Sequence, residues 1–154
     1  MSTHANAAKQ IRKELKENFP KTNFRVTSKT YSGGNSIRIY WIDGPTTKEV
    51  NKISGKYEYG HFDGMTDCYE MSNCRDDISQ VKFVFNDRTI SNSVNENVFK
   101  MLQESYSFFD KVSHIDETSR ELLDHWSVWS AREYVSRIVR DLDLSEGFKK
   151  ERIA

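Results

Sequence analysis

The sequence predicts an α+β fold in which a small antiparallel sheet with packed helices is followed by a C-terminal helical unit. Two observations predict it. Apolar residues alternate with a period of two within residues 24–42 and again within 81–85, as they do along half-buried strands. From Ser93 the period lengthens to the 3.6 residues of a helix. We therefore expect an α+β domain over residues 1–92 and a helical extension over 93–154, packed together as a single compact unit.

The first helix is predicted over residues 6–18, where Ala8, Ile11 and Leu15 form one apolar stripe among lysines and arginines. Phe19-Pro20 ends it, because the residue before a proline is pushed out of the helical region. A strand follows, with Phe24 and Val26 alternating with polar neighbours.

The stretch SGGNSIRIYWIDGP, residues 32–45, predicts the turn and second strand of a hairpin. Gly33 and Gly34 can adopt the positive φ angles of a tight turn, and Pro45 ends the pairing because it has no N–H to donate. The alternation gives one face, expected under the first helix, to Ile37, Ile39 and Trp41, and the other to Arg38, Tyr40 and Ile42.

A second, short helix begins with the capping box Thr46-x-x-Glu49 and stops at Gly55. Residues 56–77 show no clean period and are longer than an ordinary connection, which indicates a functional loop or an irregular strand pair. Strand character then returns, with one face expected to hold Val81, Phe83 and Phe85. Asn86-Asp87 is expected to turn the chain into a short strand at Thr89-Ile90.

The extension is predicted to begin with the capping box Ser93-x-x-Glu96 and to restart at Ser130-x-x-Glu133. A further helix is expected from near Asp116. The apolar stripes expected to be buried are Val94, Val98, Met101, Leu102 and Phe109, then Leu122, Leu123 and Trp126, then Tyr134, Ile138 and Leu142.

Net charge is zero but uneven: residues 1–60 hold 11 Lys/Arg and 5 Asp/Glu, and residues 61–154 hold 12 and 18. This argues against uniform coating of nucleic acid, although a local basic face is compatible with it. No apolar run reaches the ~18 residues of a membrane span, and the N-terminus lacks the apolar core of a signal peptide. We expect a cytoplasmic protein whose cysteines, Cys68 and Cys74, stay reduced.

Four segments within residues 8–91 resemble a known family. They read IRKELKENFPKTNF, SGGNSIRIYWIDGPTTKEV, KYEYGHFDGMTDCYE and VKFVFNDRTIS. They are similar to the large polyvalent protein-associated domain family, type twenty-nine, of phages and conjugative elements. The resemblance implies a mobile-element context, often beside antirestriction and DNA-transfer functions, in a bacterial host cell. It implies no catalytic residue.

Catalysis and metal binding find little support in the sequence. His61, Cys68 and Cys74 are the candidate zinc ligands, but Cys-x5-Cys is not a usual zinc spacing. The histidines are scattered, and no Ser or Cys sits in a nucleophile-elbow context. We expect no enzyme and no cofactor, with zinc as the alternative at these three residues.

Two functions remain. The first is a non-catalytic anti-defence protein, an anti-CRISPR or antirestriction inhibitor that binds a bacterial nuclease or CRISPR effector. Its predicted contact surface is Tyr57, Tyr59, Asp63, Asp67 and Tyr69 in the loop, and Trp129 on a C-terminal helix, since Trp and Tyr are common interface anchors. The loop aspartates could equally cap turns, with Tyr57 and Phe62 plugging the sheet edge.

The alternative is a nucleic-acid-binding accessory of conjugation or phage replication. Basic residues of the first helix and the hairpin lie among tyrosines, a pattern that suits phosphate contact and base stacking. It would equally fit a solvated helix face with ordinary strand tyrosines. This hypothesis predicts that one face is shared by Lys9, Arg12, Lys13 and Arg38.

Overall fold

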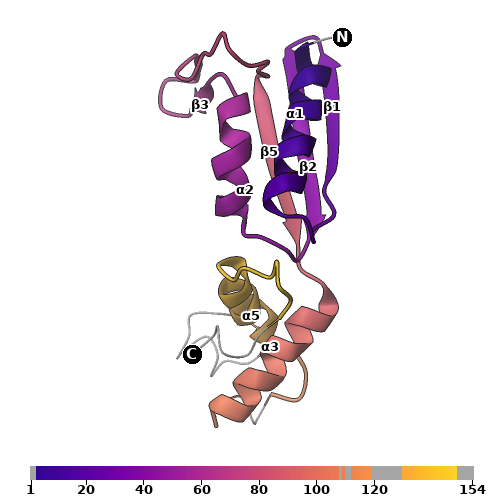
Figure 1. Ribbon diagram of the computed structural model, residues 1–154. Helices are drawn as coiled ribbons and strands as arrows, with labels where there is room; N and C mark the ends of the chain where they lie inside the picture. The colour runs from indigo at the N-terminus through magenta and orange to yellow at the C-terminus, as the bar shows by residue number, and fades with distance from the viewer. Residues whose placement is uncertain (1–2, 108, 110–111, 119–129, 149–154) are drawn as a thin grey trace. The chain divides into compact units, whose positions relative to one another are not determined.

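The computed structural model describes residues 3–107, 109, 112–118 and 130–148. The chain divides into two compact units, Met1–Thr89 and Ile90–Ala154, each with its own core (Figure 1). The α+β class is confirmed. The expected packing of the extension on the first unit stays a prediction.

The first unit is a three-stranded sheet with two helices. In chain order its elements are α1 (Thr3–Asn18), β1 (Arg25–Tyr31), β2 (Gly34–Ile42), α2 (Thr47–Ser54), the 3₁₀ turn η1 (Gly55–Tyr57), β3 (His61–Asp63), β4 (Cys68–Glu70) and β5 (Phe83–Thr89). The sheet order is β1-β2-β5, and β3 and β4 form a separate hairpin. Helices α1 and α2 lie on the same face of the sheet (Figure 1).

The sheet is mixed. Strands β1 and β2 pair antiparallel through the turn at Ser32-Gly33, with Gly34 at φ +142° as the hairpin prediction requires. Strand β5 pairs with β2 in parallel, which the sequence analysis did not predict. A parallel neighbour needs a long crossover, and residues 43–82, including α2, provide it.

The core of the first unit lies between the sheet and α1, on the predicted face. Ile37, Ile39 and Trp41 are buried, together with Ile11 and Leu15 of α1. The indole Nε1 of Trp41 donates to the carbonyl oxygen of Pro45 at 3.0 Å, so the buried ring has no unsatisfied donor.

The Asp43-Gly44-Pro45 segment also fastens β2 to β5. Asp43 and Gly44 both have φ near +56°. Their carbonyl oxygens accept hydrogen bonds from the Arg88 guanidinium, at 2.8 Å and 3.0 Å respectively. A Cβ on Gly44 would lie 2.7 Å from the Thr22 side chain. The turn therefore fixes the end of the parallel pair as well as stopping β2.

Two expectations for the third strand are wrong. Asn86-Asp87 is no turn, because β5 runs on to Thr89. Asn86 instead accepts a hydrogen bond from Ser54 and donates one to Asn51 of α2, which satisfies its amide inside the strand. Phe83 and Phe85 also do not share the face of buried Val81, since the register pairs Ile37 with Val84 and Arg38 with Phe85.

The second unit contains α3 (Asn92–Ser105) and α5 (Ala131–Arg140). The cap of α3 is Ser91, which accepts from the Val94 amide, and not Ser93 as predicted. Ser130 caps α5 as predicted. The apolar stripe predicted from Val94 to Phe109 is buried. The stripe predicted for α5 is not: Tyr134, Ile138 and Leu142 are only half-buried, and the buried residues beside them are Ala131, Val135 and Val139.

Residues 116–118 are not helical, and Asp116 forms an ion pair with Arg132 of α5; the helix expected from near Asp116 stays a prediction. Leu122, Leu123 and Trp126 lie outside the described residues. None of the helices in the described part of the chain is long and apolar enough to cross a membrane.

Trp41→Ala should lower the free energy of unfolding by about 3–5 kcal/mol, because it removes a fully buried ring. Ile42→Ala is the matched control: the next residue points outward with 52% of its surface exposed, and its loss should stay within ~0.5 kcal/mol. Urea denaturation of both variants measures this, and equal losses would contradict the assigned faces.

Candidate functional site

The sheet face that α1 and α2 leave open carries cations and aromatic rings in register. We call it the open face. It consists of alternate residues of the three strands, and the pairing sets them in rows across the sheet. The rows, written from β1 through β2 to β5, are Lys29–Ser36–Phe83, Thr27–Arg38–Phe85 and Arg25–Tyr40–Asp87.

A shallow groove of about 400 Å³ crosses this face, lined by Arg25, Thr27, Lys29, Arg38, Tyr40 and Asp87. Three of these side chains are cationic and one is anionic. The Arg38 Nε lies 3.0 Å from the Asp87 carboxylate, and the guanidinium sits 5.4 Å from the centre of the Phe85 ring. Arg38 is therefore held in place, while Arg25 and Lys29 give the β1 side of the groove its positive charge.

Aromatic rings on the open face are accessible. Tyr31, Tyr40 and Phe85 are 44%, 37% and 42% exposed. Phe85 stacks against Phe83, with ring centres 6.0 Å apart, and Phe83 meets Tyr69 edge-on at 5.4 Å. A row of rings thus runs from the open face toward β4.

Residues 59–74, which include β3 and β4, form a small hairpin that we call the arm; it projects beside α2 (Figure 1). Asp63 accepts hydrogen bonds from the Met65 amide at 2.9 Å and the Thr66 hydroxyl at 3.1 Å. These bonds lower the pKa of Asp63. Asp67 is exposed with φ +52°. Asp63 thus caps the turn, as the structural alternative for the loop predicts.

The tyrosines around the arm differ in exposure. Tyr57 is 1% exposed, so its place in a contact surface is wrong. Tyr59 and Tyr69 are half-buried against each other, with ring centres 5.7 Å apart. The Tyr69 hydroxyl donates to the carbonyl oxygen of Lys82. Burial, with a smaller contribution from Glu58, raises the pKa of Tyr69 to about 12. Trp129 lies outside the described residues.

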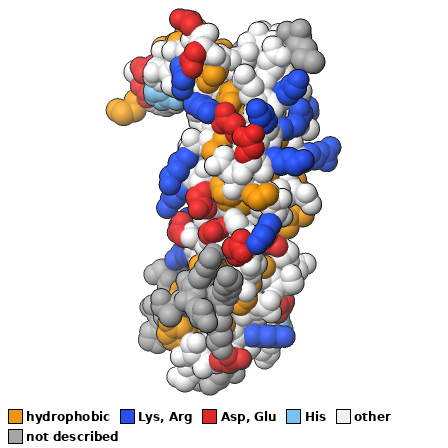
Figure 2. All heavy atoms as spheres, in the orientation of Figure 1, with side chains coloured by type: hydrophobic (Ala, Val, Ile, Leu, Met, Phe, Trp, Pro, Cys, Tyr) orange, Lys and Arg blue, Asp and Glu red, His pale blue; other side chains and the backbone are white. Residues whose placement is uncertain are grey.

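Sequence reasoning missed the apolar residues that the arm exposes. Phe62 is 55% exposed, so the alternative in which it plugs the sheet edge is wrong; Met71 is 71% exposed and Met65 96%. Apolar side chains can be seen projecting from this part of the surface in Figure 2. The sequence did contain a clue: apolar residues in this segment follow neither the period of a strand nor that of a helix. Without such a period they do not form a face that can be buried in a core.

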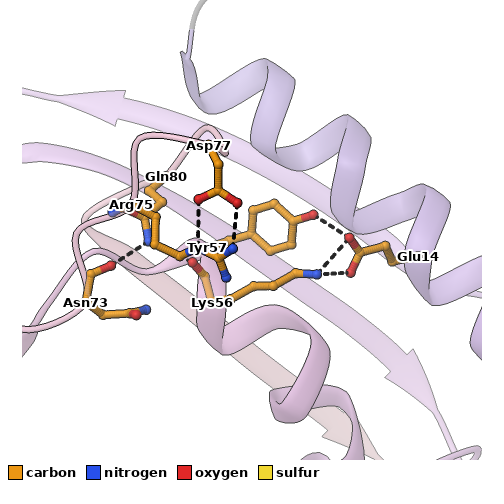
Figure 3. A network of polar contacts seen from close by, with 7 residues as sticks. All are labelled: Glu14, Lys56, Tyr57, Asn73, Arg75, Asp77 and Gln80. Carbon is orange, nitrogen blue, oxygen red and sulfur yellow. Dashed lines mark hydrogen bonds and ion pairs between the residues drawn. The ribbon is translucent and has the colours of Figure 1, made fainter.

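A polar network fixes the base of the arm to α1 (Figure 3). The Glu14 carboxylate accepts from the Tyr57 hydroxyl at 2.8 Å and pairs with Lys56 at 2.7 Å. Gln80 donates to the carbonyl oxygens of Lys56 and Asn73, both at 2.7 Å. Burial and then the Glu14 hydrogen bond raise the pKa of Tyr57, so its hydroxyl stays a donor. The buried tyrosine is therefore structural.

A family model described as large polyvalent protein associated domain 29 matches residues 2–94. The chain belongs to this family. The match includes the whole sheet, the open face and the arm, so this is a phage- and mobile-element-associated domain followed by a helical unit. No curated protein and no solved structure matches the chain.

The basic residues predicted for nucleic acid do not share one face of the polyvalent-protein domain. Lys9, Arg12 and Lys13 belong to α1, which packs on the covered face, whereas Arg38 is on the open face. Arg12 donates to the Val26 carbonyl oxygen at 2.6 Å, and Lys13 lies 3.9 Å from Glu17. The alternation along the second strand had already put Arg38 on the face opposite the first helix, so the two expectations were incompatible, and the structure follows the alternation.

The zinc candidates lie in the arm. His61 contacts the Ser72 hydroxyl at 2.9 Å and Glu70 at 3.8 Å. Cys68 and Cys74 are exposed free thiols, and the Cys74 sulfur donates weakly to the Tyr59 carbonyl oxygen. Within the residues that the structure describes, no three His, Cys, Asp or Glu side chains are grouped to hold a metal ion.

Tyr57→Phe should lower the free energy of unfolding by about 1 kcal/mol, since it removes the hydrogen bond to Glu14 from a buried network. Tyr40→Phe, which removes a hydroxyl from an exposed ring, should leave stability unchanged. Urea denaturation at pH 7 compares the two, and an unchanged Tyr57→Phe variant would show that the network contributes nothing to stability.

Proposed function

We propose that the chain is a non-catalytic accessory protein of a mobile element and that it binds nucleic acid through the open face. One observation carries this proposal: Arg25, Lys29 and Arg38 lie on the same sheet face as exposed aromatic rings. Cations for phosphates and rings for bases are the two components of such sites. The set of side chains there suits binding and offers no nucleophile with an adjacent base.

The charge on this face is sufficient although the net charge of the chain is zero. Binding to a polyanion depends on the local cations that replace condensed counterions. Asp87 is paired with Arg38, so Arg25 and Lys29 remain to contact phosphates. A site with so few cations predicts modest affinity and a shallow salt dependence, because the slope of log K against log salt scales with the number of phosphate contacts.

Arg25→Gln and Lys29→Gln should each weaken binding of an oligonucleotide. Each should also reduce the slope of log K against log salt by about 0.7–0.9, because each removes one phosphate contact. Fluorescence anisotropy with a labelled mixed-sequence oligonucleotide, as a single strand and as a duplex, between 20 and roughly 200 mM salt measures both effects.

The matched control is Lys52→Gln, which removes an exposed lysine from α2 on the covered side. It should leave affinity and slope unchanged. An equal effect of all three substitutions would show that total charge, and not the open face, governs binding. Absence of binding to either form at low salt would overturn the proposed function.

The first function expected from the sequence, an anti-defence inhibitor that acts by protein–protein binding, is supported by a different surface. The arm exposes Phe62, Met65 and Met71, and exposed clusters of large apolar side chains mark protein contact sites. Mobile elements meet restriction nucleases and CRISPR effectors in the bacterial cytoplasm. We propose such an enzyme as the partner of the arm, with Tyr59 and Tyr69 at its base.

The chain with the combined substitutions Phe62→Ser and Met65→Ser should no longer protect an incoming phage or plasmid against the host's restriction or CRISPR system. The measurement is plaque or transfer efficiency in hosts with and without a defined restriction or CRISPR system. Arg25→Gln is the control and should keep protection. Protection that survives loss of the arm side chains, in a folded variant, would remove this candidate.

A further inference from the structure

We propose that the nucleic acid bound by the open face is single-stranded, with its bases on β2 and β5 and its phosphates along β1. This inference rests on the proposed function and specifies the form and orientation of the ligand. It follows from three features of the face: where the rings are, where the carboxylate is and where the cations are.

The rings identify the form. Tyr40 and Phe85 lie on adjacent strands in neighbouring rows, and both are more than one-third exposed, whereas the third accessible ring, Tyr31, lies at the end of β1 beyond Lys29. A ring on a sheet surface can stack only on a base that has left its own stack, and duplexes keep their bases inside. Single strands offer a face of every base, and each stacked base adds substantially to affinity.

The carboxylate sets the orientation. Asp87 lies directly opposite Tyr40 on β5 and neutralises Arg38, so this side of the groove has no surplus positive charge to hold a phosphate. A carboxylate can instead accept a hydrogen bond from an exocyclic amino group of a base. The base side of the strand therefore lies over β2 and β5, next to the Phe85 ring.

The cations complete the assignment. Arg25 and Lys29 lie on β1, at the opposite side of the groove from Asp87 and Phe85. The phosphodiester chain is placed there, where the local charge is positive. Beyond Phe85 the rings of Phe83 and Tyr69 continue the row, and the Lys82 ammonium lies 5.0 Å and 5.5 Å from the centres of the Tyr69 and Phe83 rings. The strand can thus extend toward the arm.

The test compares labelled mixed-sequence single strands of DNA and of RNA, whose bases include exocyclic amino groups, with a duplex of the same length, using the full chain. At least one of the single strands should bind about tenfold or more tightly than the duplex. Phe85→Ala and Tyr40→Ala should each weaken single-strand binding by about tenfold, the usual loss for one stacked base, without changing the salt slope. Tyr40→Phe keeps the ring and should keep the affinity.

Ile42→Ala is the matched control, because Ile42 is an exposed apolar residue of the same strand and face without a ring. Circular dichroism confirms that each variant is folded. The inference would be overturned by equal affinity for duplex and single strands. It would also be overturned if Phe85→Ala and Tyr40→Ala bound single strands as tightly as the unchanged chain. In that case the losses in Arg25→Gln and Lys29→Gln would still uphold the proposed function. No binding of any oligonucleotide would overturn both.

Discussion

The alternation of side chains along β2 is the constraint on which the first unit depends. This central strand has a paired neighbour on each side, so its residues define both faces of the sheet. Ile37, Ile39 and Trp41 fill the core below it, and Arg38 and Tyr40 stand on the open face. A shift of one residue would exchange the two sets. The burial that stabilises the fold is therefore also what holds the proposed binding residues at the surface.

Strand β5 brings the second half of the candidate site, and its register is fixed at both ends. Near its start the Lys82 amide donates to Asn35 at 2.8 Å. Near its end the Arg88 guanidinium holds the carbonyl oxygens of Asp43 and Gly44. Between these contacts Phe85 lies beside Arg38, and Asp87 beside Tyr40. The ring, the ion pair and the groove exist because a strand about forty residues further along the chain is locked to β2.

The sequence predicts what depends on neighbours in the chain. The Thr46–Glu49 capping box, the glycine turn and the alternation in β2 are local features, and all are confirmed. The direction of β5 is not local, because Asn86-Asp87 favours a turn until α2 supplies partners for the Asn86 amide. The burial of Tyr57 could be raised from the sequence only as one of two alternatives, since it depends on Glu14, 43 residues earlier. The open face could therefore be predicted only in part. Alternation along the chain identifies its β1 and β2 residues, whereas its β5 residues depend on the non-local pairing of β5 with β2.

The two candidate functions use surfaces that the fold keeps separable. Gln80 and the Glu14–Tyr57 hydrogen bond hold the base of the arm. The exposed apolar side chains of the arm do not take part in these contacts. The open face is anchored by the core on the other side of the same strands. Substitutions on either surface should therefore leave the core intact, and each activity can be removed alone. The row of rings from Phe85 through Phe83 to Tyr69 links the two surfaces physically. A ligand lying along that row would reach the base of the arm, which is how nucleic acid on the sheet could affect a protein held by the arm.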